Sequence, residues 1–100
     1  QGAGKAVCCY GGILVMNRSE ILDTAKQAVT KDRAETHGDA EKNFSQIAAI
    51  WSLRTGATIT AAQVALMMVD LKVARAWGNS GHADNWVDIA GYAACGGEIG

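Results

Sequence analysis

The sequence predicts an all-α fold, a single domain in which four helices form a bundle-like arrangement. Apolar residues recur at helical spacing in four segments, no alternating strand pattern extends beyond a few residues, and the chain contains no proline. Its 100 residues favour one domain with one core, and a composition of 49% apolar and 19% charged residues is that of a globular protein.

Charge and cysteine usage disfavour several classes of function. Nine Lys and Arg against ten Asp and Glu give a net charge of −1, so no basic field favours DNA or RNA as a partner. No segment reaches the ~20 apolar residues that span a bilayer, so no membrane partner is expected. Cys8, Cys9 and Cys95 lack the pairing of a disulfide framework and the spacing of a zinc site, which favours a reducing, cytoplasmic location.

Residues 1–15 are interpreted as an N-terminal extension or arm, and residues 16–100 as the helical domain. The apolar block from Ala6 to Val15, with Lys5 before it, is similar to the apolar part of a signal peptide. Glycines interrupt that block, and a polar helix start follows where a small-residue cleavage site would be expected. The plainer alternatives are an alternative translation start, a cloning remnant or an arm that packs on a neighbouring subunit.

The first helix is expected to begin after Asn17, because Glu20 would then complete a capping box, although Ser19 is a second candidate cap. The helix should run to about Thr30. Its apolar face comprises Ile21, Leu22, Ala25, Ala28 and Val29. The charge-rich stretch 31–38 follows and reads as an exposed helix end and a turn.

Asp39 can cap the second helix, and Gly56 should end it. Its apolar face comprises Phe44, Ile47, Ala48 and Trp51, with Leu53 at its end. A second capping box, Thr60 with Gln63, and a staple of Ile59 with Val64 predict the start of the third helix. Residues 61–77 are apolar almost all round, which is typical of a helix in the middle of a bundle or in a subunit interface. We therefore expect this helix to be the central element.

Asp84 or a neighbour should start the fourth helix, and Gly96 and Gly97 should end it. Its expected buried face comprises Trp86, Ile89, Ala90 and Ala93. The core of such a domain is small, and the third helix has more apolar surface than three short neighbours cover. A homo-oligomer, and a dimer in particular, is therefore expected.

The fourth helix carries the first polar cluster that could support chemistry. Asp84, Asp88 and Tyr92 are spaced i, i+4, i+8 along one side, with Asn85 adjacent. Two carboxylates one turn apart can share a magnesium ion together with substrate phosphates. The alternative is that Asp84 caps the helix or complements its dipole, and that Asp88 is a solvated side chain.

The second cluster interrupts the apolar third helix. Lys72 and Arg75 are three residues apart and could hold phosphate together, whereas Asp70 points away from Lys72 and needs a partner on another helix. The alternative is a structural ion pair between Asp70 or Asp88 and one of these cations. His37 and His82 stand alone in loops and are more simply solvated side chains than ligands or bases.

Several motifs together resemble a family of small uncharacterised proteins of tailed phages and prophages. These motifs are Asp32-Arg33, His37-Gly38, Asn43-Phe44, Trp51, Leu71-Lys72-Val73-Ala74-Arg75 and, most specifically, Asp84-Asn85-Trp86-Val87-Asp88-Ile89-Ala90-Gly91-Tyr92. The resemblance covers Met16 to about Glu98. More distantly, the chain is similar to the helical MazG-like nucleotide pyrophosphatases and to a phage domain associated with nucleotide modification.

The resemblance implies magnesium-dependent cleavage of a nucleoside triphosphate to the monophosphate and pyrophosphate, in a dimer or tetramer. MazG-like enzymes resemble one another in four metal-binding carboxylates, a Glu-x-x-Glu pair and a Glu-x-x-Asp pair. This chain departs from that pattern, because its second helix offers only Asp39 and Glu41 near its start and its fourth offers Asp84 and Asp88.

The resulting hypothesis is a phage-type protein of nucleotide metabolism. It assigns magnesium to Asp84 and Asp88, with Glu41 and Asp70 as further ligand candidates, and phosphate to Lys72 and Arg75. Substrate-binding candidates are His37, Asn43, Asn85 and Tyr92. The rival hypothesis is a non-catalytic oligomeric protein that binds a nucleotide or a host factor, in which the same charges form ion pairs between subunits.

Overall fold

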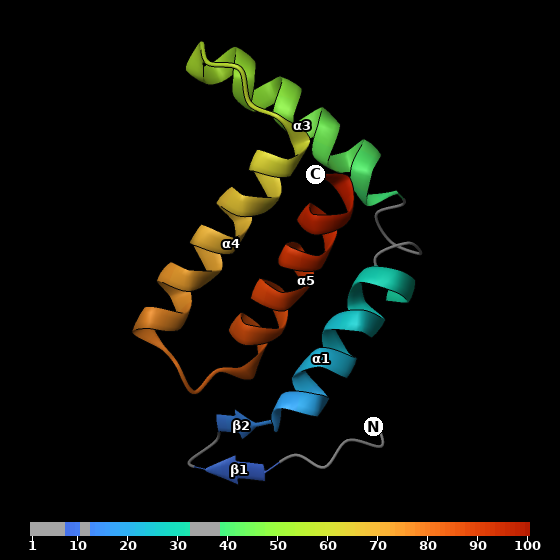
Figure 1. The fold of residues 1–100 in the computed structure, drawn as a ribbon. Coiled ribbons are helices and arrows are strands. Elements are labelled where there is room, and N and C mark those ends of the chain that lie inside the picture. The colour runs from blue at the N-terminus through green and yellow to red at the C-terminus, as the bar shows by residue number, and fades with distance from the viewer. Residues whose placement is uncertain (1–7, 11–12, 33–38) are drawn as a thin grey trace.

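The computed structural model describes residues 8–10, 13–32 and 39–100. Four α-helices make up most of the described chain, which confirms the all-α prediction (Figure 1). The elements in order are β1 (Cys8–Tyr10), β2 (Ile13–Val15), α1 (Arg18–Gln27), a π-helical segment η1 (Ala28–Asp32), α3 (Ala40–Thr55), α4 (Ala61–Gly78) and α5 (Ala83–Ile99). Among the described helices, none combines the length and apolar character needed to cross a bilayer.

Both predicted capping boxes are confirmed. The side chain of Asn17 accepts a hydrogen bond from the Glu20 amide at 2.8 Å, and the Glu20 carboxylate accepts one from the Asn17 amide at 2.8 Å. At the start of α4, Thr60 and Gln63 make the same reciprocal pair at 3.2 and 2.9 Å. Each box satisfies amide groups that the first helical turn leaves without a partner, which fixes where α1 and α4 begin.

The connection from α3 to α4 is held by its own polar groups. Asp39 caps the start of α3 as expected, and Gly56 ends the helix in the left-handed conformation with φ 76°, which glycine adopts without strain. The Ser52 hydroxyl accepts a hydrogen bond from the Ile59 amide at 2.8 Å. This contact ties the segment before α4 back onto α3 and sets the direction in which α4 leaves.

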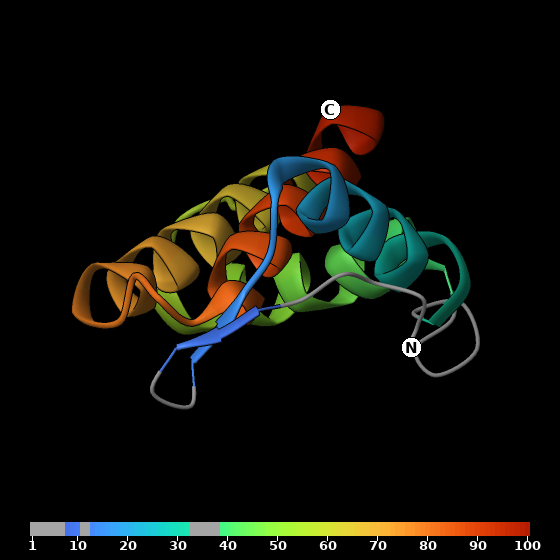
Figure 2. The same cartoon turned by 90° about the horizontal axis from the view of Figure 1, so that it is seen from below.

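Helices α1, α5 and α4 lie side by side with α5 in the middle, and α3 crosses one end of this layer (Figures 1 and 2). The expectation that the segment 61–77 is central is therefore wrong, because α5 contacts α1, α3 and α4 whereas α4 lies at the edge of the layer. An edge helix can still be apolar all round where part of its surface stays available to a partner.

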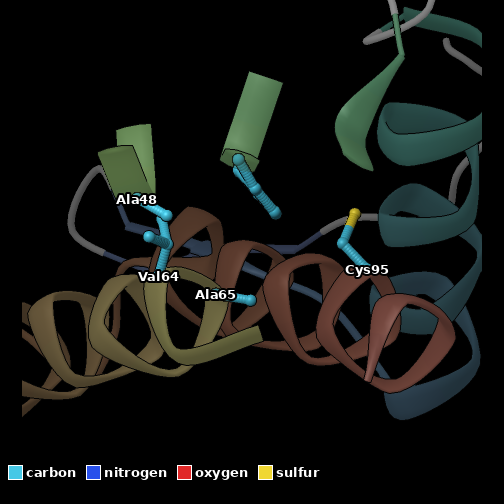
Figure 3. Close-up of a cluster of buried hydrophobic side chains, with 5 residues drawn as sticks. Ala48, Val64, Ala65 and Cys95 are labelled. Carbon is cyan, nitrogen blue, oxygen red and sulfur yellow. The ribbon is translucent and has the colours of Figure 1, made fainter. Parts of the chain in front are cut away.

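The core lies where α3 crosses α4 and α5. Its buried members are Phe44, Ala48, Val64, Ala65 and Cys95, four of which are labelled in Figure 3. Phe44 and Val64 are the largest side chains that are fully buried, at 1% and 0% exposure. The predicted apolar face of the second helix is confirmed in Phe44 and Ala48.

The expected buried face of the fourth helix is wrong at two of its four positions, since Ile89 and Ala90 are half-buried. Trp86 and Ala93 are exposed, whereas the buried residues of α5 are Ala83, Asn85, Val87, Gly91 and Cys95. Small residues face the core because α5 has close neighbours on two sides: a Cβ atom on Gly91 would lie 3.1 Å from Cγ1 of Val29.

The glycine pair also does not end the fourth helix, since α5 continues to Ile99. A Cβ atom on Gly96 would lie 2.9 Å from the Cβ of Ala65, so this glycine serves the close approach of α5 to α4.

The predicted N-terminal arm contains an element that the sequence analysis did not anticipate. Strands β1 and β2 pair in antiparallel fashion, with Cys8 opposite Val15 and Tyr10 opposite Ile13, and β2 contacts α5.

Candidate functional site

The polar residues predicted to carry chemistry lie mainly on α4 and α5, which run antiparallel beside each other (Figure 1). The structure brings one predicted phosphate ligand and one predicted metal ligand together: Nζ of Lys72 lies 2.9 Å from Oδ2 of Asp88. The Lys72 side chain is 15% exposed and that of Asp88 39%. The alternative of an ion pair between these helices is thus what the geometry shows.

Asp84 lies one turn before Asp88 on α5 and is open to solvent. Its side chain is 73% exposed, and its Oδ2 atom lies 3.7 Å from Nε2 of His82, which is itself 55% exposed. A contact at this distance between two exposed groups contributes little to stability. Asp84 also lies in the first turn of α5, where a negative charge complements the helix dipole.

The remaining charged candidates are not gathered around this pair. Arg75, Asp70 and Glu41 have exposed side chains, and within the described part of the chain none of them makes an ion pair. Residues 8–10, 13–32 and 39–100 also contain no group of three or more His, Cys, Asp or Glu that could hold a metal ion.

The predicted substrate-binding residues occupy different environments. Asn85 is buried at 6% exposure, and Asn43 on α3 is half-buried. Tyr92 packs against Phe44 with ring centroids 6.2 Å apart and an interplanar angle of 40°, a tilted arrangement typical of core aromatic pairs. His37 lies outside the described residues.

A second candidate surface, which residue-by-residue reasoning did not single out, is the side of α4 and α5 turned away from α3. We call it the α4–α5 outer face. It comprises Ala62, Leu66, Val69, Val73 and Trp77 of α4 and Trp86, Ile89, Ala93 and Gly97 of α5. Positions three or four apart share one side of a helix, and Val73 lies about half a turn around α4 from Val64, which faces α3.

The large apolar side chains of the outer face are unusually exposed to solvent. Trp77 is 90% exposed, Leu66 63%, Trp86 46% and Val73 45%. Asp70, four residues after Leu66 and three before Val73, is an exposed charged side chain that adjoins this face. A contiguous apolar surface of this kind is characteristic of a site of protein association.

Two recesses lie between α4 and α5 along the outer face. The first, about 330 Å³, is at the tryptophan end and is lined by Val73, Ala76, Trp77, Ser80, Trp86 and Ile89. The second, about 440 Å³, is at the glycine end, where small side chains leave room; Ala62, Leu66, Val69, Ala93 and Gly97 are among its lining residues. We refer to them as the tryptophan recess and the glycine recess.

Trp86 is held in place within this face. Its Nε1–H group donates a hydrogen bond to the carbonyl oxygen of Ser80 at 2.8 Å, across the connection between α4 and α5. The indole is thus fixed before any partner binds, which lowers the entropy lost on association. The sequence signal for this surface was the all-round apolar character of residues 61–77, which had indicated either a central helix or an interface.

Comparison with known proteins places this chain among phage proteins. It is 45% identical over 74 residues to the Gene 55 protein of Mycobacterium phage L5, an alignment that covers 73% of this chain and 47% of the relative. It is 35% identical over 75 residues to the Gene 55 protein of Mycobacterium phage D29, covering 75% of this chain and 50% of that relative.

The chain thus spans about half the length of these curated relatives. No solved structure matches it. Residues 20–100, which include α3, α4, α5 and nearly all of α1, match the family described as "Domain of unknown function (DUF6378)". The chain belongs to this family of phage proteins, as the match over four fifths of its length shows.

Proposed function

We propose that this domain is a non-catalytic, oligomeric interaction module of a phage protein, and that it binds another protein through the α4–α5 outer face. The exposure of Trp77, Leu66, Val73 and Trp86 on one predominantly apolar surface carries the proposal. A partner that covers such large apolar groups releases the water around them. This burial favours association by about 25 cal/mol of free energy per Å² of apolar surface. The near-neutral charge of the chain supports a protein rather than a nucleic acid as the partner. The lack of a disulfide framework in its cysteine spacing supports the cytoplasm of the infected cell as the location.

The ion pair supports a structural role for the charges that could have served an enzyme. A phosphate that approached Lys72 would have to displace the Asp88 carboxylate, and a metal ion at Asp88 would have to displace the ammonium group 2.9 Å away. Because Lys72 is largely shielded from solvent, breaking the pair without replacing both contacts would leave a poorly hydrated charge. The two groups therefore satisfy each other in the absence of a ligand.

A second candidate function is magnesium-dependent hydrolysis of a nucleoside triphosphate to the monophosphate and pyrophosphate. One observation favours it: Asp84 and Asp88 lie one turn apart on α5, with Lys72 opposite on α4 and Asp84 open to solvent. Bound magnesium would stabilise charge on the phosphates, and Asp84 and Asp88 are the side chains that would hold it. Arg75, one turn after Lys72, could then contact phosphate from its exposed position.

One assay separates the two candidates. The purified chain is incubated with Mg²⁺ and a panel of ribo- and deoxyribonucleoside triphosphates, and released pyrophosphate is measured. We expect no release above the rate without protein. Asp88→Asn is measured beside the wild type, with Asp23→Asn as a matched control, since Asp23 is an exposed carboxylate on α1. Release by the wild type that Asp88→Asn abolishes and Asp23→Asn retains would overturn the interaction proposal in favour of the enzyme.

A further inference from the structure

We propose that the partner of the α4–α5 outer face is a second copy of this chain, and that Trp77 of each copy fills the glycine recess of the other. The inference rests on the proposed function and deepens it by naming the partner. It follows from three properties of the outer face: its shape, the two-fold symmetry that this shape permits, and its exposed area.

The outer face is complementary to itself. A protruding side chain, Trp77, lies at one end and an open recess of about 440 Å³ at the other. The recess is more than ten times the ~30 Å³ that a water molecule occupies in the liquid, which is ample for an indole ring. A two-fold axis through the middle of the face, near Val69 and Val73, carries the tryptophan end of one copy onto the glycine end of the other.

This arrangement has the symmetry that most homodimers use. In an isologous interface, residue i of one copy contacts residue j of its partner, and residue j contacts residue i in return. Trp77 and the glycine recess are separated by the length of α4, about 22 Å from Trp77 to Ala62 at 1.5 Å per residue. The two contacts are therefore far enough apart to fix the relative orientation of the copies.

Two side chains of the outer face supply a large part of the area that a stable dimer buries. With Trp77 90% and Trp86 46% exposed, the two indoles present roughly 340 Å² if a free indole side chain exposes about 250 Å². That is about two fifths of the ~800 Å² that each partner buries in a standard interface. Leu66, at 63% exposure, and Val73, at 45%, extend the same surface.

The experiment measures the dimer dissociation constant by sedimentation equilibrium over a dilution series of the 100-residue chain. Trp77→Ala removes both tryptophan anchors of the symmetric dimer, so it should raise this constant about 1,000-fold, the effect of two losses of about 2 kcal/mol each. Leu53→Ala is the matched control, because Leu53 is 84% exposed but lies on α3. This control should leave the constant unchanged.

A second variant tests the recess without threatening the fold. A Cβ atom at Gly97 meets no heavy atom within 4 Å, so Gly97→Leu can fill the recess while improving the helix propensity of α5. It should also weaken the dimer. In an equimolar mixture of Trp77→Ala and Gly97→Leu, one Trp77 meets one open recess, and the small Ala side chain meets the filled one. The mixture should therefore dimerise at concentrations at which each variant alone is monomeric.

Three results would overturn the inference: a wild-type chain that is monomeric at its highest soluble concentration, an unchanged constant for Trp77→Ala, or no recovery in the mixture. Failure of the proposed function is a different result, because it would be detected as pyrophosphate release in the nucleotide assay. If the dimer dissociation constant is unchanged by both substitutions, the dimer contact lies on another surface. The partner of the outer face is then a different protein.

Discussion

Adjacent glycines near the end of α5 allow a sharp test of how α4 and α5 pack. Gly96→Ala and Gly97→Ala make the same chemical change at neighbouring positions of one helix. Replacing glycine by alanine inside a helix is favourable by up to about 1 kcal/mol at either position. A Cβ atom at Gly97 meets nothing within 4 Å, whereas one at Gly96 would lie 2.9 Å from the Cβ of Ala65, so α4 and α5 would have to separate.

The expected magnitudes follow from these distances. Overpacking of a tight contact costs about 1–3 kcal/mol, which exceeds or cancels the gain in helix propensity at Gly96. Gly97→Ala should therefore stabilise the domain by up to about 1 kcal/mol, while Gly96→Ala should be neutral or destabilising. The difference between the two variants should be about 1–3 kcal/mol, and each 1 kcal/mol corresponds to about 4–8 °C in Tm for a domain of this size.

Urea unfolding followed by circular dichroism measures the difference, and an unchanged m-value confirms that the transition stays comparable. Both substitutions are made in the Trp77→Ala background, so that association of copies does not contribute to the free energy of unfolding. Equal stabilisation by the two substitutions would refute the close approach of α5 to Ala65. Destabilisation by both would refute the continuation of α5 through the glycines, because alanine cannot replace a glycine that ends a helix without strain.

Three further predictions use the same unfolding assay. Phe44→Ala should lower the free energy of unfolding by about 3–5 kcal/mol, whereas Leu53→Ala, at an exposed position of α3, should change it by about 0.5 kcal/mol or less; similar effects would contradict the described core. Thr60→Ala removes the side-chain cap of α4 and should cost about 1 kcal/mol, and a neutral result would refute the capping box. A double-mutant cycle of Lys72→Met and Asp88→Asn should give a coupling of about 1 kcal/mol, while no measurable coupling would deny the ion pair a structural role.

The sequence predicted the helix boundaries best where a local signal determines them. The capping residues Asn17, Asp39 and Thr60 act through hydrogen bonds to amides two or three residues away, so they need no knowledge of the tertiary structure. The signal from Gly56 is equally local, because it depends only on the backbone conformation of that residue. These four positions define the starts of α1, α3 and α4 and the end of α3.

The face of α5 could not be predicted because burial depends on neighbours that the sequence does not place. A helix with Trp86 and Ile89 on one side and Ala83 and Gly91 on the other would ordinarily bury the large residues, since they release more apolar surface. In this domain α5 lies between two helices, and the small residues admit a closer approach than Trp86 would. The large residues are left on the outer face.

The sequence predicted which residues belong to the polar site but not how these residues are arranged. The spacing on α4 and α5 identified Lys72 and Asp88 as candidates, and their pairing was one of the alternatives that the sequence left open. Whether a cation meets a carboxylate or a ligand depends on the register between two helices, which helix periodicity does not determine. The expected clustering of Lys72 with Arg75 rested on their spacing alone, and Arg75 instead points to solvent.

The sequence carries a signal for the β1–β2 pair that apolar periodicity does not reveal. Two glycines, Gly11 and Gly12, separate the apolar runs Cys8–Tyr10 and Ile13–Val15 in the sequence. A two-residue glycine spacing between apolar runs is a known hairpin pattern. The runs are only three residues long, which is why periodicity gave no strand signal there.

The order of the helices along the chain has a consequence for how the domain folds. The middle helix of the layer, α5, comes after its neighbour α1 by more than half the chain. It contacts α1 directly, and Gly91 meets Val29 in the η1 segment that follows α1. Closing so long a loop is entropically costly, whereas α4 and α5 are joined by a short connection and can pair early. We expect α1 to remain undocked on the nascent chain until α5 has left the ribosome, so that a segment made early becomes native late.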